Sequence, residues 1–211
     1  INLSNFKTDN LEDLSFTFRG CGKLTSLEIS KLDTSSVTTM SFTFAECNFL
    51  TNIDVSQFET SNVKDMSNMF SGCTKLTSID VSKFNTENVE DISEMFGGCN
   101  SLQSINLSSF NTKSVKYMSS MFLKCSSLVS LDLSNFNTDN VEDIFSMFSH
   151  CSNLKELNLN HFKTSKIEDM SYLFEECNKL TSLNISNFNT KIVYDMQNMF
   201  AGCSQIKELD L

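Results

Sequence analysis

The chain of 211 residues contains no proline, no tryptophan and a single arginine, Arg19. Its 16 basic residues are outnumbered by 26 acidic ones, which leaves a formal charge of -10. Nucleic acid is bound by clustered Lys and Arg side chains that face the phosphates. The composition therefore predicts no nucleic-acid partner, and it disfavours binding to an anionic membrane surface for the same reason.

Long apolar runs are absent as well. No stretch approaches the ~20 apolar residues that a membrane-spanning helix needs, so we expect no membrane insertion by this part of the protein. No charged-then-apolar amino-terminal segment indicates a signal peptide. The chain opens on Ile1 in the middle of a repeat, which leads us to expect a fragment of a longer array.

Residues that carry catalysis or hold metal ions are scarce. The six glycines form no phosphate-binding loop, and the eight cysteines include no C-x-x-C pair. Only His150 and His161 are available as imidazole ligands. His150 adjoins Cys151, but adjacent side chains seldom face one substrate, so we interpret it as a solvated residue at a helix end. The sequence predicts no enzyme, no catalytic residue, no metal site and no cofactor.

The chain does contain a 26-residue repeat, in eight copies without insertion or deletion. The register is set by Cys21, Cys47, Cys73, Cys99, Cys125, Cys151, Cys177 and Cys203. A Phe precedes each cysteine by three residues, a second Phe column begins at Phe6 with Leu32 as its exception, and a threonine column begins at Thr8. Because so small a unit cannot bury its apolar face alone, identical columns must stack on one another.

Each repeat predicts two elements. The pattern L-x-x-L-x-L after the cysteine alternates with the period of a short strand. The apolar residues of 63–73 recur at helical spacing and predict a helix that begins near Asn62 and ends near Gly72. We expect an α/β fold, a single β-α solenoid over 1–211, with one short parallel strand and one helix per repeat and strands from 1–3 to 209–211.

The cysteines and three phenylalanines stand apart from ordinary surface residues. One Cys per unit, at equal spacing on the inward stripe, predicts buried and reduced thiols rather than disulfides or metal ligands.

Phe16, Phe42 and Phe49 lie outside the two Phe columns. We expect them to form an exposed patch or a seat for preceding sequence.

Between the two inward residues of each expected strand lies an outward polar residue. Parallel strands lie ~4.8 Å apart, so these side chains and neighbouring serines form a continuous polar strip, named here the strand strip. Its candidate partner-binding residues are Asp54, Asp80, Ser104, Asn106, Ser130, Asp132, Asn158 and Asn184. A solvated ladder, a partner-binding face and a weak cation site all remain open. The variable columns of the other side, such as Lys64, Glu90, Lys116 and Glu142, are the alternative binding surface.

The L-x-x-L-x-L pattern resembles the leucine-rich repeat, with Phe where many classes carry Asn. The phrase LDLSNFNTDNVEDIFSMFSHCSNL (131–154) resembles the BspA-like family of leucine-rich-repeat surface proteins, and the resemblance covers the whole chain. The resemblance implies a right-handed superhelical solenoid of strands and helices that is exported to the cell surface and attaches to host proteins.

These observations lead to one main hypothesis. The chain is a non-enzymatic, monomeric module of an extracellular, cell-surface protein, and it binds a protein partner such as a host surface or matrix protein. Solenoids present the extended surfaces that such binding needs. A structural spacer and an intracellular scaffold are the alternatives.

Overall fold

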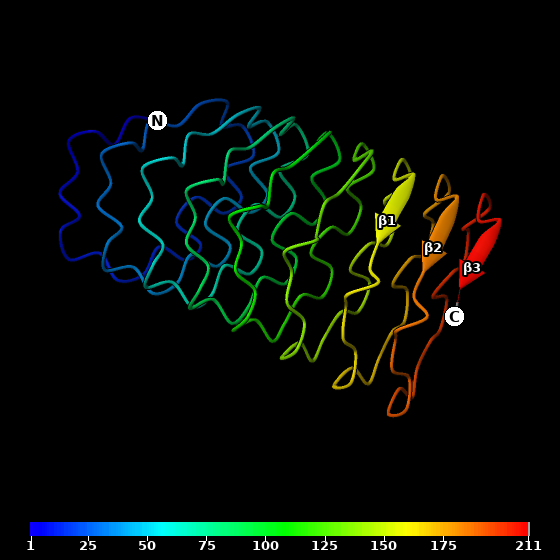
Figure 1. Ribbon diagram of the computed structural model, residues 1–211. Coiled ribbons are helices and arrows are strands. Elements are labelled where there is room, and N and C mark those ends of the chain that lie inside the picture. The colour runs from blue at the N-terminus through cyan, green and yellow to red at the C-terminus, as the bar shows by residue number, and fades with distance from the viewer. Residues whose placement is uncertain (211) are drawn as a thin grey trace.

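The computed structural model describes residues 1–210 as a stack of flattened coils, one for each 26-residue repeat (Figure 1). The coils follow one another in chain order from one end of the stack to the other. Parallel backbone contacts join each residue to the one 26 positions later, as in the bridges between Asp65 and Asp91 and between Tyr117 and Asp143. The register predicted from the cysteines is therefore the register of the stack.

Regular strands occur only in the last coils of the described chain. β1 (Glu156–Asn158), β2 (Ser182–Asn184) and β3 (Glu208–Asp210) form a parallel sheet in the order β1-β2-β3. In the earlier coils the same positions form single bridges, between Asn2 and Glu28 and between Ser130 and Glu156. The prediction of a strand in every repeat is thus too regular. Residue 211, the last of the ninth predicted strand, lies outside the described residues.

The prediction of one helix per repeat is wrong, because residues 1–210 contain no helix. No part of the described chain therefore offers a helix that could cross a membrane. Overlapping turns take the place of the predicted helix, and in residues 68–73 the backbone N–H groups alternate between two sets of acceptors. Odd-numbered N–H groups donate to the carbonyl three residues earlier, as Met69 does to Met66, and even-numbered ones donate to the next coil, as Phe70 does to Met95 at 3.0 Å.

Backbone torsion and coil spacing both exclude a helix here. Asn68 and Gly72 have φ values of 57° and 71°, which lie in the left-handed region that a right-handed helix cannot use. The rings of Phe70 and Phe96 are stacked with centroids 5.8 Å apart, whereas neighbouring helices need 8–10 Å. A stack of helices would separate the Phe rings. Overlapping turns give the same three- and four-residue apolar spacing as a helix, so the sequence pattern could not distinguish them.

The core consists of columns that stack on themselves. The Phe column from Phe18 to Phe200 is a continuous stack with ring centroids 5.5–6.0 Å apart. From Cys47 onward, each cysteine thiol donates to the carbonyl of the Phe residue 29 positions earlier, at 3.0–3.2 Å. Six cysteines are free and buried, while Cys21 and Cys203 are partly exposed. The prediction that the thiols are buried is confirmed for those six, and their reduced state stays a prediction.

The threonine column joins neighbouring coils through its hydroxyl groups. Thr112 Oγ1 accepts a hydrogen bond from the Asn137 N–H at 2.7 Å and donates to the Asn137 carbonyl at 2.8 Å. The same pair of bonds is formed by Thr34, Thr60, Thr86, Thr138 and Thr164. A threonine hydroxyl thus forms hydrogen bonds to a backbone N–H and carbonyl of the next coil, at a position where the two main chains do not bond each other directly.

Replacing Thr112 with Val tests this role. The change keeps the side-chain shape but leaves the Asn137 N–H and carbonyl without their partner, which we expect to lower the free energy of unfolding by about 2–3 kcal/mol. The matched control is Thr77→Val, because Thr77 is exposed and its replacement should stay within about 0.5 kcal/mol. Equal effects of the two changes in chemical denaturation would contradict the bridging role.

Thiol reactivity tests the cysteine column. Burial raises the pKa of Cys47 to about 11 and that of Cys177 to about 12, so the reactive thiolate is scarce at neutral pH. We expect a thiol reagent to modify Cys21 and Cys203 first and the six buried thiols only after denaturation. Mass spectrometry of the native protein gives the sites, and early labelling of Cys99 or Cys125 would show that the column is accessible.

Candidate protein-binding surfaces

The strand strip is exposed along its whole length. All eight of its predicted binding residues are exposed. Four of them, Ser130, Asp132, Asn158 and Asn184, line one hollow of about 690 Å³ over β1 and β2. The other four, Asp54, Asp80, Ser104 and Asn106, occupy the same columns in earlier coils and do not line that hollow. The structure therefore brings half of the predicted residues into one concave surface.

The acidic residues of the strand strip stabilise the turns in which they lie. Asp54, Asp80 and Asp132 each accept a hydrogen bond from the backbone N–H two residues later, at 2.9–3.0 Å. Hydrogen bonds from the serine at that position hold the pKa of these three carboxyls below their usual range. Such Asx turns explain why the column alternates between Asp and Asn, since both supply the acceptor oxygen. Within residues 1–210, no three His, Cys, Asp or Glu side chains converge in a way that could hold a metal ion.

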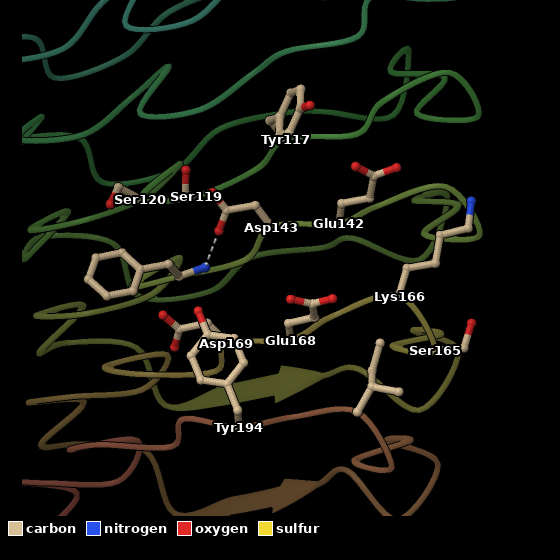
Figure 2. Close-up of a pocket in the computed structure, with 12 residues that line it drawn as sticks. Tyr117, Ser119, Ser120, Glu142, Asp143, Ser165, Lys166, Glu168, Asp169 and Tyr194 are labelled. Atoms are coloured by element: carbon tan, nitrogen blue, oxygen red, sulfur yellow. Dashed lines mark hydrogen bonds between the residues drawn. The ribbon is translucent and has the colours of Figure 1, made fainter.

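A second polar ladder runs along the side where helices were predicted. Parallel bridges connect Asp65, Asp91, Tyr117 and Asp143 from coil to coil. These carboxylates also accept a hydrogen bond from the N–H two residues later, as Asp143 does from Phe145 at 2.9 Å (Figure 2). Burial raises the pKa of Asp91, and the like charges of its ladder neighbours add to the effect.

A hollow of about 780 Å³ lies on this second ladder, across four coils from 117–120 to 192–194. We name it the aromatic hollow. Its walls carry the rings of Tyr117, Phe145 and Tyr194 together with Ile192. The carboxylates of Glu142, Asp143, Glu168 and Asp169 lie between the rings of Tyr117 and Tyr194 (Figure 2).

The aromatic residues of this surface depart from the columns of the repeat. Tyr117 replaces the ladder aspartate, Phe145 replaces a serine, and Tyr194 stands in a column of Glu, Lys and Thr. The three side chains are 41%, 37% and 74% exposed. The sequence analysis missed these residues, although the comparison with their columns that singled out Phe16, Phe42 and Phe49 would have found them.

Phe145 interrupts a column of serines. In two pairs of neighbouring coils the serine hydroxyl of this column bonds to the one 26 residues earlier: Ser41 to Ser15 at 3.1 Å and Ser119 to Ser93 at 3.3 Å. Ser171, which follows Phe145 in the column, is 2% exposed and its hydroxyl has no partner among the described residues. A buried hydroxyl without a hydrogen bond lowers stability. Phe145 therefore cannot supply the hydroxyl partner that a serine at this position would offer to Ser171.

The amino-terminal phenylalanines form a related cluster. Phe16 and Phe42 stack with centroids 4.8 Å apart, and the Arg19 guanidinium lies 5.7 and 5.1 Å from the two ring centroids. Arg19 also pairs with Glu46 at 3.1 Å. Phe16 and Phe49 are exposed, as predicted, whereas Phe42 is half-buried.

The variable columns proposed as the alternative surface lie beside the aromatic hollow. Lys64, Glu90, Lys116 and Glu142 line a hollow of about 480 Å³. Lys116 pairs with Glu90 at 2.7 Å. Glu142 and Lys166 line both hollows, so the two join into one elongated surface.

Restoring the serine at 145 tests whether Phe145 belongs to the core. We expect Phe145→Ser to change the free energy of unfolding by less than about 1 kcal/mol, because the gained hydroxyl bond to Ser171 offsets the lost contact between the Phe145 and Tyr172 rings. The matched change Phe148→Ser, in the fully buried Phe column, should cost at least about 3 kcal/mol. A loss above about 2 kcal/mol for Phe145→Ser would mean that Phe145 is a packing residue.

Comparison with known structures shows the fold. The leucine-rich-repeat protein TpLRR of T. pallidum is 23% identical with a TM-score of 0.54, over 82% of this chain and 74% of that one. A leucine-rich-repeat protein of Eubacterium ventriosum is 21% identical with a TM-score of 0.50, over 84% of this chain and 45% of that one. One from Bacteroides ovatus is 20% identical over 92% of this chain and 57% of that one, with a TM-score of 0.47. This chain thus spans about half the length of the latter two proteins, and the predicted leucine-rich-repeat solenoid is confirmed.

The family of the chain follows from its sequence. Residues 1–105, 71–158 and 146–211 match the family described as "Mycoplasma protein of unknown function, DUF285". Because these matches together span the chain, it belongs to this family. No curated protein sequence matches it.

Proposed function

We propose that this DUF285-family solenoid is a non-enzymatic protein-binding module and that the aromatic hollow is its main binding surface. The observation that carries the proposal is the gathering of Tyr117, Phe145 and Tyr194 in one hollow, in columns that are mostly polar elsewhere in the stack. Exposed aromatic side chains are enriched at protein interfaces and dominate their binding energy. The inner columns are committed to stacking, so specificity has to reside in exposed columns such as these.

The shape of the surface supports a protein segment as the partner. The aromatic hollow crosses four coils and continues into the neighbouring hollow through Glu142 and Lys166. An elongated surface of this kind fits an extended or helical segment better than a compact small molecule, which is usually enclosed on most sides. Leucine-rich-repeat solenoids are suited to such binding because they present long surfaces.

The strand strip is the second candidate surface. Its carboxylates are exposed, and its carboxyl-terminal half is concave. Each carboxylate already accepts a bond within its own Asx turn, and the strip carries no exposed aromatic side chain among its eight predicted residues. These features favour the aromatic hollow.

The proposal extends to location and partner. The resemblance to BspA-like surface proteins supports a monomeric module of a cell-surface or secreted protein that attaches to a host surface or matrix protein. A structural spacer would bind nothing through either surface, and an intracellular scaffold would bind a partner inside the cell.

Two sets of substitutions test which of the two candidate surfaces, the aromatic hollow or the strand strip, binds the partner. Tyr117→Asp, Phe145→Ser and Tyr194→Glu together return the aromatic hollow to residues found in the same columns of other coils, and Asp54→Lys, Asp80→Lys and Asp132→Lys reverse the charge of the strand strip. In a surface-binding assay against a panel of purified host surface and matrix proteins, we expect the first variant to lose at least about 30-fold in affinity, which corresponds to one hot-spot contact of about 2 kcal/mol. The second variant should bind within about twofold of the parent.

The opposite pattern, with binding lost only in the strand-strip variant, would assign the function to the strip. Absence of binding by the parent to every protein of the panel would favour the spacer. Circular dichroism and thermal unfolding of both variants serve as controls, because a loss of binding is informative only where the stack is intact.

A further inference from the structure

We infer that the aromatic hollow binds the guanidinium groups of an arginine-bearing protein segment. This inference rests on the proposed function and names the chemistry of the partner. It is drawn from the pairing of aromatic rings with carboxylates in the hollow and from a second site in the same chain where that pairing already holds an arginine.

The amino-terminal cluster shows the interaction within the chain itself. The Arg19 guanidinium lies over the stacked rings of Phe16 and Phe42, 5.7 and 5.1 Å from their centroids, while its Nη2 pairs with Glu46 at 3.1 Å. Aromatic faces and a carboxylate thus hold one guanidinium together. Both interactions are favourable for a planar cation, which stacks on a ring and donates hydrogen bonds at its edge.

The aromatic hollow offers aromatic rings and carboxylates as well, but no arginine. The rings of Tyr117, Phe145 and Tyr194 line it. Beside the lining, Tyr172, in the column of Phe16 and Phe42, meets Phe145 edge to face with ring centroids 5.6 Å apart, so the parallel stack of the amino-terminal pair is not reproduced. Arg19 is the single arginine of the chain, so no guanidinium of its own is available to this site. Among the described residues that line the hollow, Lys166 is the one cation.

The charges of the hollow favour a cationic occupant. Glu142, Asp143, Glu168 and Asp169 line it and lie between the rings of Tyr117 and Tyr194 (Figure 2). Arginine fits better than lysine, because a guanidinium is weakly hydrated, stacks on aromatic faces and binds carboxylates through two parallel hydrogen bonds. The net charge of -10 adds a long-range attraction for such a segment.

Length sets how many residues the hollow accommodates. From the coil of Tyr117 to that of Tyr194 there are three coil spacings, or ~14 Å at the ~4.8 Å separation of parallel chains. Four extended residues span ~13 Å. A segment of about four residues therefore covers the hollow from one tyrosine to the other.

Tyrosine fluorescence provides a reporter at the site. The chain has no tryptophan and three tyrosines; Tyr117 and Tyr194 line the hollow, and Tyr172 packs on Phe145. We expect N-acetyl tetra-arginine amide to change the tyrosine emission saturably at physiological ionic strength, with a Kd at least about fivefold lower than that of N-acetyl tetra-lysine amide. No saturable change, or equal affinity for the two peptides, would overturn the inference.

Variants locate the binding. Phe145→Ser with Tyr194→Glu should abolish the preference for arginine, because the rings that stack on the guanidinium are removed. Glu142→Gln with Glu168→Gln should weaken tetra-arginine binding at least fivefold. The charge-matched control, Glu59→Gln with Glu87→Gln, removes two exposed carboxylates outside the lining of the hollow and should bind as the parent does. Equal weakening by both Gln pairs would show attraction by net charge alone and would overturn the inference.

Competition separates this inference from the proposed function. With a partner protein whose binding depends on the hollow, tetra-arginine amide should displace the partner and tetra-lysine amide should do so less well. If the triple variant Tyr117→Asp, Phe145→Ser and Tyr194→Glu loses the partner but tetra-arginine amide does not compete, the aromatic hollow remains a protein-binding surface. The inference that it is specific for guanidinium groups is then wrong. If the partner binds the triple variant as it binds the parent, the proposed function itself is wrong.

Discussion

The spacing between successive coils is the constraint on which this structure depends. Backbone hydrogen bonds join the turn segments of successive coils with N···O distances of 2.6–3.1 Å, as between Phe70 and Met95, and the centroids of the stacked Phe rings are 5.5–6.0 Å apart. Threonine hydroxyls extend the same contact to positions where main chains do not meet. A residue in an inner column faces its own kind above and below, so any change disturbs two contacts at once. This is why the inner columns hardly vary within the chain.

The polar columns combine structure with surface charge. Asp and Asn residues at the corners of the coil accept a hydrogen bond from the backbone N–H two residues later, which fixes the turn. Stacking then sets like charges in line at ~4.8 Å, with a repulsion on the order of 1 kcal/mol per pair in water. The raised pKa of Asp91 reflects burial and this repulsion. Tyr117 interrupts the ladder next to Asp91 and introduces a ring in place of a further carboxylate.

Residues that differ from the rest of their column indicate where the surface of such a stack has a function. Phe145 leaves the buried hydroxyl of Ser171 without a partner, and Tyr172 adopts a positive φ of 61°, a conformation unfavourable for a large side chain. Neither residue improves the core, since each lies in a column that is polar in most coils. Phe145 lines the aromatic hollow with Tyr117 and Tyr194, and Tyr172 packs against Phe145, an arrangement consistent with selection for binding rather than for stability.

The sequence by itself determined the repeat length, the register, the inward columns and the buried thiols, because each follows from identical residues at intervals of 26 that have to stack. It also located the outward residues of the strand strip. It could not determine that the segment 68–73 is a run of turns, since the spacing of Met66, Met69 and Phe70 fits a helix equally well and only the close packing of neighbouring coils excludes one. Nor could it assemble the aromatic hollow, whose residues are separated by up to 77 positions from Tyr117 to Tyr194 and become neighbours only when four coils lie in contact.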